Sequence, residues 1–366
     1  MVAEVLFLRK QRNNNGFVIK FNLLGGSYSI SVILGVNFFP QRNKTVMMNL
    51  VAGIDIGGTK TKIGLVNKKG KCIVQTFFRT REYEDFDLYL DHIVATITAL
   101  CDELDEEVNL IGCGIGAPNA SDRNGTIEHA TNLIWKGSVP IVRKLHERLN
   151  VPMKIMNDAS AAALGEMLFG NARGMRDFIV ITLGTGFGAG IVANGQLISG
   201  YDGFAGELGH IDMTLGDGRL TGLNIRGGLE AYVSATGLKR TIMHMQCKYM
   251  DESRFRAIAY NDLHGEEITK AAEEGDILAI KAFDYTSKIL GLALANFTAF
   301  TQPEAFFLLG GLANSGKWIF DTTEKYMNES LLEVYKGKVK ILPSGMPNKT
   351  AAICGAAALI WENHTI

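Results

Sequence analysis

LVAGIDIGGTKTKIGLVNKKGKCIVQTFFRT, residues 50–80, alternates short apolar runs with turns that contain glycine. The runs have the length of strands and are separated by the GG and KKG turns, so this stretch predicts an antiparallel meander of three strands. The same order returns in DFIVITLGTGFGAGIVANGQLISG, residues 177–200. Helical patterns follow both meanders. We therefore predict an α/β protein with two duplicated halves that face a cleft.

The rest of the chain supplies the other elements of these halves. Helical spacing predicts helices, and short buried runs predict strands. The predicted helices are residues 85–104, 139–150, 159–173, roughly 263–300 and 351–364, and the predicted strands are residues 110–118, 151–158 and 305–311. No clear linker appears, so we place the domain boundary near residue 157. This gives a smaller domain of residues 48–157 plus 351–366 and a larger domain of residues 158–350.

Composition narrows the class of protein. The chain has 366 residues, 47% of them hydrophobic, which suggests two packed domains. Its net charge of -1 gives no electrostatic reason to expect nucleic acid or an anionic membrane as a partner. The five cysteines lack metal-binding or redox spacing, and no apolar run is long enough to span a membrane. We expect a soluble, cytoplasmic protein.

The N-terminal residues differ from the rest. Residues 1–46 carry six Lys or Arg against one acidic residue, with runs of Asn and no sustained period. The apolar segment SYSISVILGVNFF, residues 27–39, is compatible with an added strand pair and lies too far in for an ordinary signal peptide. We predict that residues 1–47 are a disordered or loosely attached extension, or an upstream translation artefact, with Met48 as a natural start.

The first glycine turn, in DIGGTKT, has the residues of a phosphate site. Gly57 and Gly58 let backbone N–H groups approach a phosphate closely, and Thr59 and Lys60 add a donor and a positive charge. Asp55, at the end of the strand, suits Mg²⁺ held through water. A tight hairpin with a solvated lysine is the alternative for this motif taken alone.

The second glycine turn, LGTGFGAG at residues 183–190, repeats this device with Gly184, Thr185 and Gly186. Neither turn is a Walker loop, because no G-K-[ST] leads into a helix. Neither is a dinucleotide-binding turn, because neither is followed directly by a helix. Two such hairpins in duplicated halves favour phosphate binding over a pair of unrelated turns.

An aspartate that could act in catalysis, Asp158, lies in IMNDASAAALGE, residues 155–166, between a predicted strand and an alanine-rich helix. One interpretation makes Asp158 the N-cap of that helix. The other makes Asp158 a general base that accepts a proton from a substrate hydroxyl, with Asn157 beside it as donor and acceptor. Because two phosphate-type hairpins accompany it, we favour the general base.

Other polar residues suit a polyol. GELGH supplies Glu207 and His210, ATNLIWKG supplies Asn132, and GGLEAY supplies Glu230. Each hydroxyl of a sugar both donates and accepts, so a buried sugar needs a site rich in amides and acceptors. Solvated loop residues are the alternative, although loops on an α/β frame commonly bind ligands.

Together these motifs resemble the ROK family of sugar kinases and regulators, within the actin/hexokinase-like superfamily, from about residue 51 to 360. GIGAP, NLIW, NDASAAALGE and GELGH follow in the family's order, and FFLLGGLANSG, with Gly310 and Gly311, resembles its adenosine-binding segment. The resemblance implies two ribonuclease H-like domains, ATP and Mg²⁺ as cofactors, and a homodimer. It also implies phosphorylation of a hexose at the 6-hydroxyl, with Asp158 as base. The sugar-binding residues that it implies are Asn132, Asn157, Glu207, His210 and Glu230.

The chain departs from the zinc motif of the family, in which three cysteines join the histidine. Thr221, Leu223 and Gly228 occupy the cysteine positions, and none of them replaces a thiolate. We therefore predict no zinc site and a purely sugar-binding role for His210.

Two loops near the predicted sugar site are also unusual. Without zinc, we expect the loop between His210 and Glu230 to be ordered by closure around sugar or by apolar anchoring through Leu220, Leu223 and Ile225. GAPNASD, residues 116–122, has less glycine and proline than many relatives, which bears on the choice of sugar.

Three classes of function remain open at this point: an enzyme, a transcriptional regulator and a non-catalytic sugar-binding protein. The leading one is a glucokinase, and N-acetylglucosamine or N-acetylmannosamine kinase is the nearest alternative enzyme. A sugar-sensing transcriptional regulator of the family would need an N-terminal winged helix-turn-helix, for which residues 1–47 are too few and too strand-like. A non-catalytic sugar-binding relative is disfavoured because Asp158 and both hairpins are intact.

Overall fold

The structure is a computed structural model that describes residues 11–13, 16–18 and 47–364. The chain divides into two compact units, residues 1–46 and residues 47–366. In the first unit, β1 (Gln11–Asn13) and β2 (Gly16–Val18) pair as antiparallel strands. The segment 27–39, expected as a possible strand pair, lies outside the described residues.

The second unit begins with a five-stranded sheet in the order β10-β6-β3-β4-β5. β3 (Met47–Ile56), β4 (Lys60–Val66) and β5 (Cys72–Arg79) form the predicted antiparallel meander. β6 (Glu107–Gly116) and β10 (Met153–Met156) continue the sheet in parallel on the other side of β3.

A second five-stranded sheet repeats this plan in the order β13-β12-β11-β14-β15. β11 (Phe178–Leu183), β12 (Phe187–Ala193) and β13 (Gln196–Leu197) form the antiparallel meander. β14 (Ala305–Leu309) and β15 (Lys340–Pro343) extend it in parallel. The predicted duplication is confirmed, because meander, parallel strands and strand order agree between the two sheets.

A small antiparallel sheet was not predicted. It consists of β7 (Ala120–Ser121), β8 (Thr126–Glu128) and β9 (Ser138–Val139). Strands of two or three residues carry too little periodicity to stand out in a sequence.

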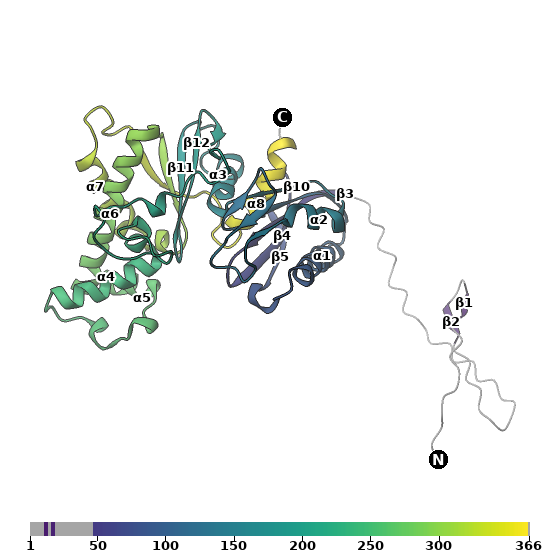
Figure 1. The fold of residues 1–366 in the computed structure, drawn as a ribbon, viewed down its shortest axis with the longest axis horizontal. Helices are drawn as coiled ribbons and strands as arrows, with labels where there is room; N and C mark the ends of the chain where they lie inside the picture. The colour runs from purple at the N-terminus through teal and green to yellow at the C-terminus, as the bar shows by residue number, and fades with distance from the viewer. Residues whose placement is uncertain (1–10, 14–15, 19–46, 365–366) are drawn as a thin grey trace, which may run out of the picture. The chain divides into compact units, whose positions relative to one another are not determined.

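Two helices with many small side chains pack against each other between the two sheets (Figure 1). They are α3 (Asp158–Phe169) and α8 (Ala351–Trp361). α8 lies so close to β3 and β6 that a Cβ added to Gly53 would be 2.1 Å from the backbone oxygen of Ile353. Glycine at this strand position therefore allows the helix backbone to approach the sheet.

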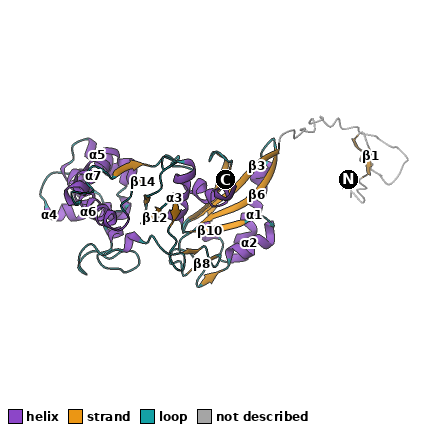
Figure 2. Cartoon of the chain, turned by 90° about the horizontal axis from the view of Figure 1, so that it is seen from above, coloured by secondary structure: helices purple, strands orange, loops and turns teal. Residues whose placement is uncertain are grey.

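The helices α4 (Ala235–Lys248), α5 (Gly265–Glu273), α6 (Ile277–Thr301) and α7 (Phe320–Ser330) lie together on the side of the second sheet away from the first (Figure 2). They bury an apolar core against β11 and β14. The single helical stretch predicted over residues 263–300 is wrong in one respect, because α5 and α6 are separate. Gly275 adopts a left-handed φ of 89° between them, and Asp276 then caps α6.

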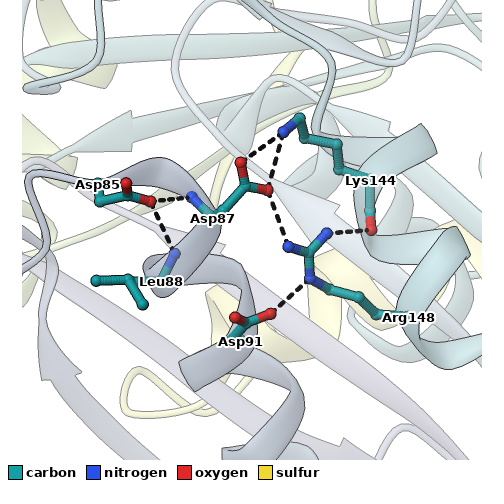
Figure 3. A network of polar contacts seen from close by, with 6 residues as sticks. All are labelled: Asp85, Asp87, Leu88, Asp91, Lys144 and Arg148. Carbon is teal, nitrogen blue, oxygen red and sulfur yellow. Dashed lines mark hydrogen bonds and ion pairs between the residues drawn. The ribbon is translucent and has the colours of Figure 1, made fainter.

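The helices α1 (Phe86–Asp102) and α2 (Ile141–Leu149) pack next to each other on the first sheet. A polar network joins them, as Figure 3 shows. Asp87 accepts hydrogen bonds from Lys144 and Arg148, and Asp91 accepts one from Arg148, at 2.7–2.8 Å. No helix in residues 47–364 is long and apolar enough to cross a membrane.

Candidate active site

A cavity of about 780 Å³ lies where β3, β11 and β14 end. In α/β folds, ligands bind outside the carboxyl ends of parallel strands. The predicted site residues that line this cavity are Asp55, Asn132, Asn157, Asp158, Gly184, Thr185, Gly186, Glu207, His210, Glu230 and Gly310. Those that do not line it are Gly57, Gly58, Thr59, Lys60 and Gly311.

The N-terminus of α3 presents its polar residues to the cavity. The N-cap is Asn157, whose Oδ1 accepts the N–H of Ala159 at 2.9 Å, and Asp158 is the first residue of the helix. The interpretation of Asp158 as the N-cap is therefore wrong by one residue. Asp158 Oδ1 also accepts the N–H of Ala159, at 2.8 Å. Within residues 47–364, Asp158 Oδ2 and Asn157 Nδ2 make no hydrogen bond, so both are available to a ligand.

The surroundings of Asp158 favour its protonated form. Desolvation by the surrounding protein, followed by the negative charges of Asp55 and Glu207, raises the pKa of Asp158 to about 6, and the N–H of Ala159 acts in the opposite direction. Asp158 is still exposed toward the open cavity that it lines. A carboxyl of this kind is ionised at neutral pH and can still exchange a proton within the working range of an enzyme.

Asp55 reaches the same cavity from the end of β3, and its Oδ2 accepts a hydrogen bond from Lys62 Nζ at 3.0 Å. Lys62 stands directly opposite Asp55 in the register of β3 and β4. Sequence reasoning missed this ion pair, although cross-strand pairing in the predicted hairpin was a signal for it. One carboxylate oxygen of Asp55 remains, which fits Mg²⁺, because that ion needs only one or two carboxylates besides water and phosphate oxygens.

The rest of the first hairpin lies beside the cavity rather than in its wall. Lys60 Nζ lies 4.3 Å from the centre of the Phe77 ring. The backbone at Gly58 packs against Asn132, whose carbonyl oxygen would be 2.6 Å from an added Cβ. The phosphate role of Thr59 and Lys60 stays a prediction.

The second hairpin lines the cavity. An added Cβ at Gly184 would meet no atom within 4 Å, so ligand space begins directly at this backbone. Glu230 is bound to the same hairpin, because its Oε2 accepts the N–H of Phe187 at 3.0 Å. A Cβ at Gly186 would lie 2.3 Å from that oxygen, so any larger residue would displace the end of the Glu230 side chain from its present position.

Glu207 and His210 form a pair at the wall of the cavity. His210 Nε2 lies 3.5 Å from Glu207 Oε2; Glu207 directly precedes the 3₁₀ turn Leu208–His210, and His210 is its last residue. The other ring nitrogen, Nδ1, is buried and has no hydrogen-bond partner in the described part of the chain. The imidazole is therefore held by one nitrogen only.

The loop between His210 and Glu230 does not show the apolar anchoring that was one of the two alternatives, and closure around sugar stays a prediction. Leu220, Leu223 and Ile225 are all exposed, so the predicted apolar anchoring is wrong. The loop is instead a set of turns and short backbone pairings, such as the bridges between Asp212 and Gly228 and between Leu220 and Arg226.

This loop does not fit a zinc site. Thr221, at the first cysteine position of the family motif, uses its Oγ1 to accept the N–H groups of Leu223 and Ile225, at 3.2 Å each. Among the residues that the structure describes, no group of three or more His, Cys, Asp or Glu is arranged to hold a metal ion.

Several cavity residues were not predicted. Those with polar side chains are Asn119, Thr131, Thr182, Thr221, Ser234, Thr236 and Arg240. Asn119 has a left-handed φ of 49° and belongs to GAPNASD, the loop whose unusual composition was the available signal. Arg240 lies on α4, outside every glycine motif, so only the packing of that helix brings it to the cavity.

A sequence model of the ROK family matches residues 51–363. The chain is 33% identical to a glucokinase of Halalkalibacterium halodurans over 270 residues, covering 72% of this chain and 81% of that protein. It is 30% identical to a glucokinase of Thermotoga maritima over 312 residues, covering 85% and 96% of the two chains. A crystal structure of a ROK family glucokinase from Streptomyces griseus, in complex with glucose and AMPPNP, has a TM-score of 0.72 and 30% identity, over 85% of this chain and 98% of that one.

Proposed function

This chain belongs to the ROK family and has its two-domain, actin/hexokinase-like α/β fold, and on that basis we propose that it transfers the γ-phosphoryl group of ATP to the 6-hydroxyl of a hexose, with glucose as the sugar. One observation carries the proposal. Asp158 shares a single cavity with the glycine hairpin of residues 183–190 and with the amide and carboxylate side chains of Asn132 and Glu230.

Asp158 is the general base in this proposal. The 6-hydroxyl gives its proton to the carboxylate as its oxygen attacks the γ-phosphorus, the bond to the β,γ-bridging oxygen breaks, and ADP leaves. Assistance of this kind contributes about 10²–10⁴ in rate. Positioning and electrostatics supply most of the remaining acceleration in phosphoryl transfer.

The sugar is bound by groups whose hydrogen-bonding state the fold already sets. Because Asn157 Oδ1 caps α3, its Nδ2 is the end that donates to a sugar hydroxyl. Because Glu230 Oε2 accepts the Phe187 N–H, its other oxygen accepts from the sugar. Asn132, Glu207 and His210 complete the set around the same cavity.

The nucleotide lies along the second hairpin in this proposal. Gly184, Thr185 and Gly186 offer backbone and hydroxyl groups to the phosphates, and Gly310 lies beside them at the end of β14. Asp55 would hold Mg²⁺ through water, and the bound ion would supply positive charge to offset that of the phosphates.

A coupled assay of ADP release tests the proposal. We expect ATP-dependent turnover with glucose, and the panel should include mannose, fructose, N-acetylglucosamine and N-acetylmannosamine. Faster turnover with an N-acetylhexosamine would replace glucose as the substrate and keep the reaction. The absence of ATP-dependent turnover with every sugar, in protein that melts cooperatively, would reject the proposed activity.

A further inference from the structure

The sugar-site segment from His210 to Glu230 is held together by backbone pairing close to the cavity. Residues 211–213 run antiparallel to residues 227–229. The N–H of Leu229 donates to the oxygen of Ile211, and the N–H of Met213 donates to the oxygen of Gly227, at 3.0 Å each. This short ladder places His210 and Glu230 next to each other at its cavity end.

Arg219 fixes the other end of the ladder to the helices behind it. Its backbone oxygen accepts the N–H of Gly227 at 2.9 Å, and its own N–H donates to the hydroxyl of Tyr232 at 3.0 Å. Its guanidinium donates to Thr241 Oγ1 at 2.8 Å, on α4. A longer contact of 3.4 Å runs from the same nitrogen to the backbone oxygen of Gly237.

Aromatic rings complete the surroundings of this guanidinium. Its carbon lies 4.8 Å from the ring centre of Tyr232 and 5.7 Å from that of Tyr285, which comes from α6. Tyr232 is two residues from Glu230 and follows its 3₁₀ turn directly. One side chain therefore joins the loop, the Glu230 turn, α4 and α6.

Two further facts separate Arg219 from an ordinary surface arginine. It makes no ion pair with a carboxylate within residues 47–364, so its partly buried charge is balanced by oxygen acceptors and ring faces alone. It also does not line the cavity, so it does not touch the substrate. Burying part of an unpaired guanidinium is unfavourable, and the contacts that offset this cost all fix the position of the loop.

We propose that Arg219 is the positioning residue of the sugar site: by locking the loop 211–229 onto α4 and α6, it holds His210 and Glu230 toward the hexose in a chain that lacks the cysteines of a zinc site. The contacts of Arg219 have to keep both side chains within hydrogen-bonding distance of the sugar, because small displacements of binding groups strongly reduce the reaction rate. This inference rests on the proposed function for the identity of the ligand, but not for the order of the loop.

Substitution of Arg219 by Met removes the charge and the donors and keeps most of the apolar length. We expect Arg219→Met to raise the KM for hexose at least tenfold, with the KM for ATP and kcat within about twofold of wild type, because the loop faces the sugar. Arg219→Lys, which keeps a donor but loses the planar group between the rings, should lie in between.

Arg226→Met is the matched control. Arg226 belongs to the same loop and donates to a backbone oxygen, that of Gly218 at 3.0 Å, but it is exposed and makes no ring contact in the described chain. The Arg226→Met variant should keep its KM for hexose and its KM for ATP near those of wild type. Tyr232→Phe, which removes only the acceptor of the Arg219 N–H, serves as a milder test if Arg219→Met does not fold.

Hydrogen exchange gives a readout that does not depend on activity. In Arg219→Met, amides of residues 211–229 should exchange at least tenfold faster, with little change in the two sheets. If the wild type phosphorylates a hexose and the variant keeps its hexose KM and its loop exchange, Arg219 is not the positioning residue. If the wild type phosphorylates no sugar, the proposed function fails, and the exchange rates still decide the role of Arg219.

Discussion

The two glycine hairpins have similar glycine-rich turns at equivalent places in the duplicated sheets, yet their residues pack against different parts of the protein. The hairpin of residues 183–190 forms a wall of the cavity, whereas the first hairpin contributes only Asp55 to it. Glycine carbonyl groups of both turns accept hydrogen bonds, but from different donors. In the first turn the donors to these glycines are side chains, Thr80 Oγ1 to the oxygen of Gly57 at 2.7 Å and Arg81 Nε to that of Gly58 at 3.0 Å. In the second turn the donors are backbone N–H groups, such as that of Ala235 to the oxygen of Gly184 at 2.9 Å.

Each hairpin also packs one glycine against a residue of the proposed sugar site. In the first hairpin the contact is Gly58 with the backbone of Asn132, and in the second it is Gly186 with the carboxylate of Glu230. A glycine turn thus permits a close approach without specifying what approaches. Under the proposed function, these two packing contacts would couple the phosphate-binding turns to the sugar-binding residues, and the following predictions test that coupling.

The largest effect is expected at Asp158, which lines the same cavity as Asp55 and the second hairpin. Asp158→Asn keeps the size of the side chain and removes the base, so kcat should fall by about 10³, within the usual range for general-base assistance. Hexose binding, followed by the shift in melting temperature on adding sugar, should persist. Turnover near that of wild type would show that another group accepts the proton.

The next largest effect is expected from alanine substitution of the packed glycine in each hairpin. Gly186→Ala pushes against the Glu230 carboxylate, so we expect a roughly tenfold higher KM for hexose, the size of one lost hydrogen bond to a charged group. Gly58→Ala pushes against the backbone of Asn132, which cannot rotate away, and should add a loss of stability in thermal melts. Equal, unchanged hexose KM values in both variants would break the proposed coupling.

A smaller effect is expected at Lys60, which lies over Phe77 outside the cavity wall. If domain closure brings the first hairpin to the nucleotide, Lys60→Met should raise the KM for ATP about fivefold, as expected for one exposed charge contact. Lys68→Met, on the exposed turn between β4 and β5, is the control. No change in the KM for ATP would mean that Lys60 does not contact the nucleotide, as expected if only the hairpin that lines the cavity binds phosphate.

The smallest effect is a shift in the pH profile. Because the pKa of Asp158 is raised to about 6, kcat/KM should fall about tenfold per pH unit below that value and level off above it. Asp55→Asn removes a neighbouring negative charge and should move this acid limb to lower pH. ATP ionises in a similar range, so the measurement is the difference between wild type and variant. If the acid limb of the pH profile does not move in Asp55→Asn, the charge of Asp55 does not raise the pKa of Asp158.

The same pKa has a consequence for stability. The folded state holds the proton of Asp158 more tightly than the unfolded chain, so this carboxyl lowers the free energy of unfolding above pH 6, and the loss disappears below about pH 4. Asp158→Asn should therefore raise the melting temperature more at pH 8 than at pH 5.

Much of the fold could be predicted because it depends on local sequence patterns. The two meanders, α1, α3 and β14 follow from apolar runs and glycine turns. The break between α5 and α6 was missed, although Gly275 before the capping Asp276 was a signal for it. The short strands of the small sheet were missed because two or three residues carry no period. The N-cap was placed one residue late because Asn157 and Asp158 are both good caps.

The residue types of the site were visible in sequence, but their contacts were not. Lys62 beside Asp55, Glu230 on the second hairpin and Arg219 between two tyrosines join residues up to 66 positions apart. Two glycine hairpins, an aspartate at the start of a helix and a set of polar side chains suited to a polyol could be predicted from sequence, because they depend on local backbone and side-chain chemistry. Which hairpin lines the cavity and which contacts order the loop could not be predicted, because such contacts depend on how the helices and the two sheets pack together.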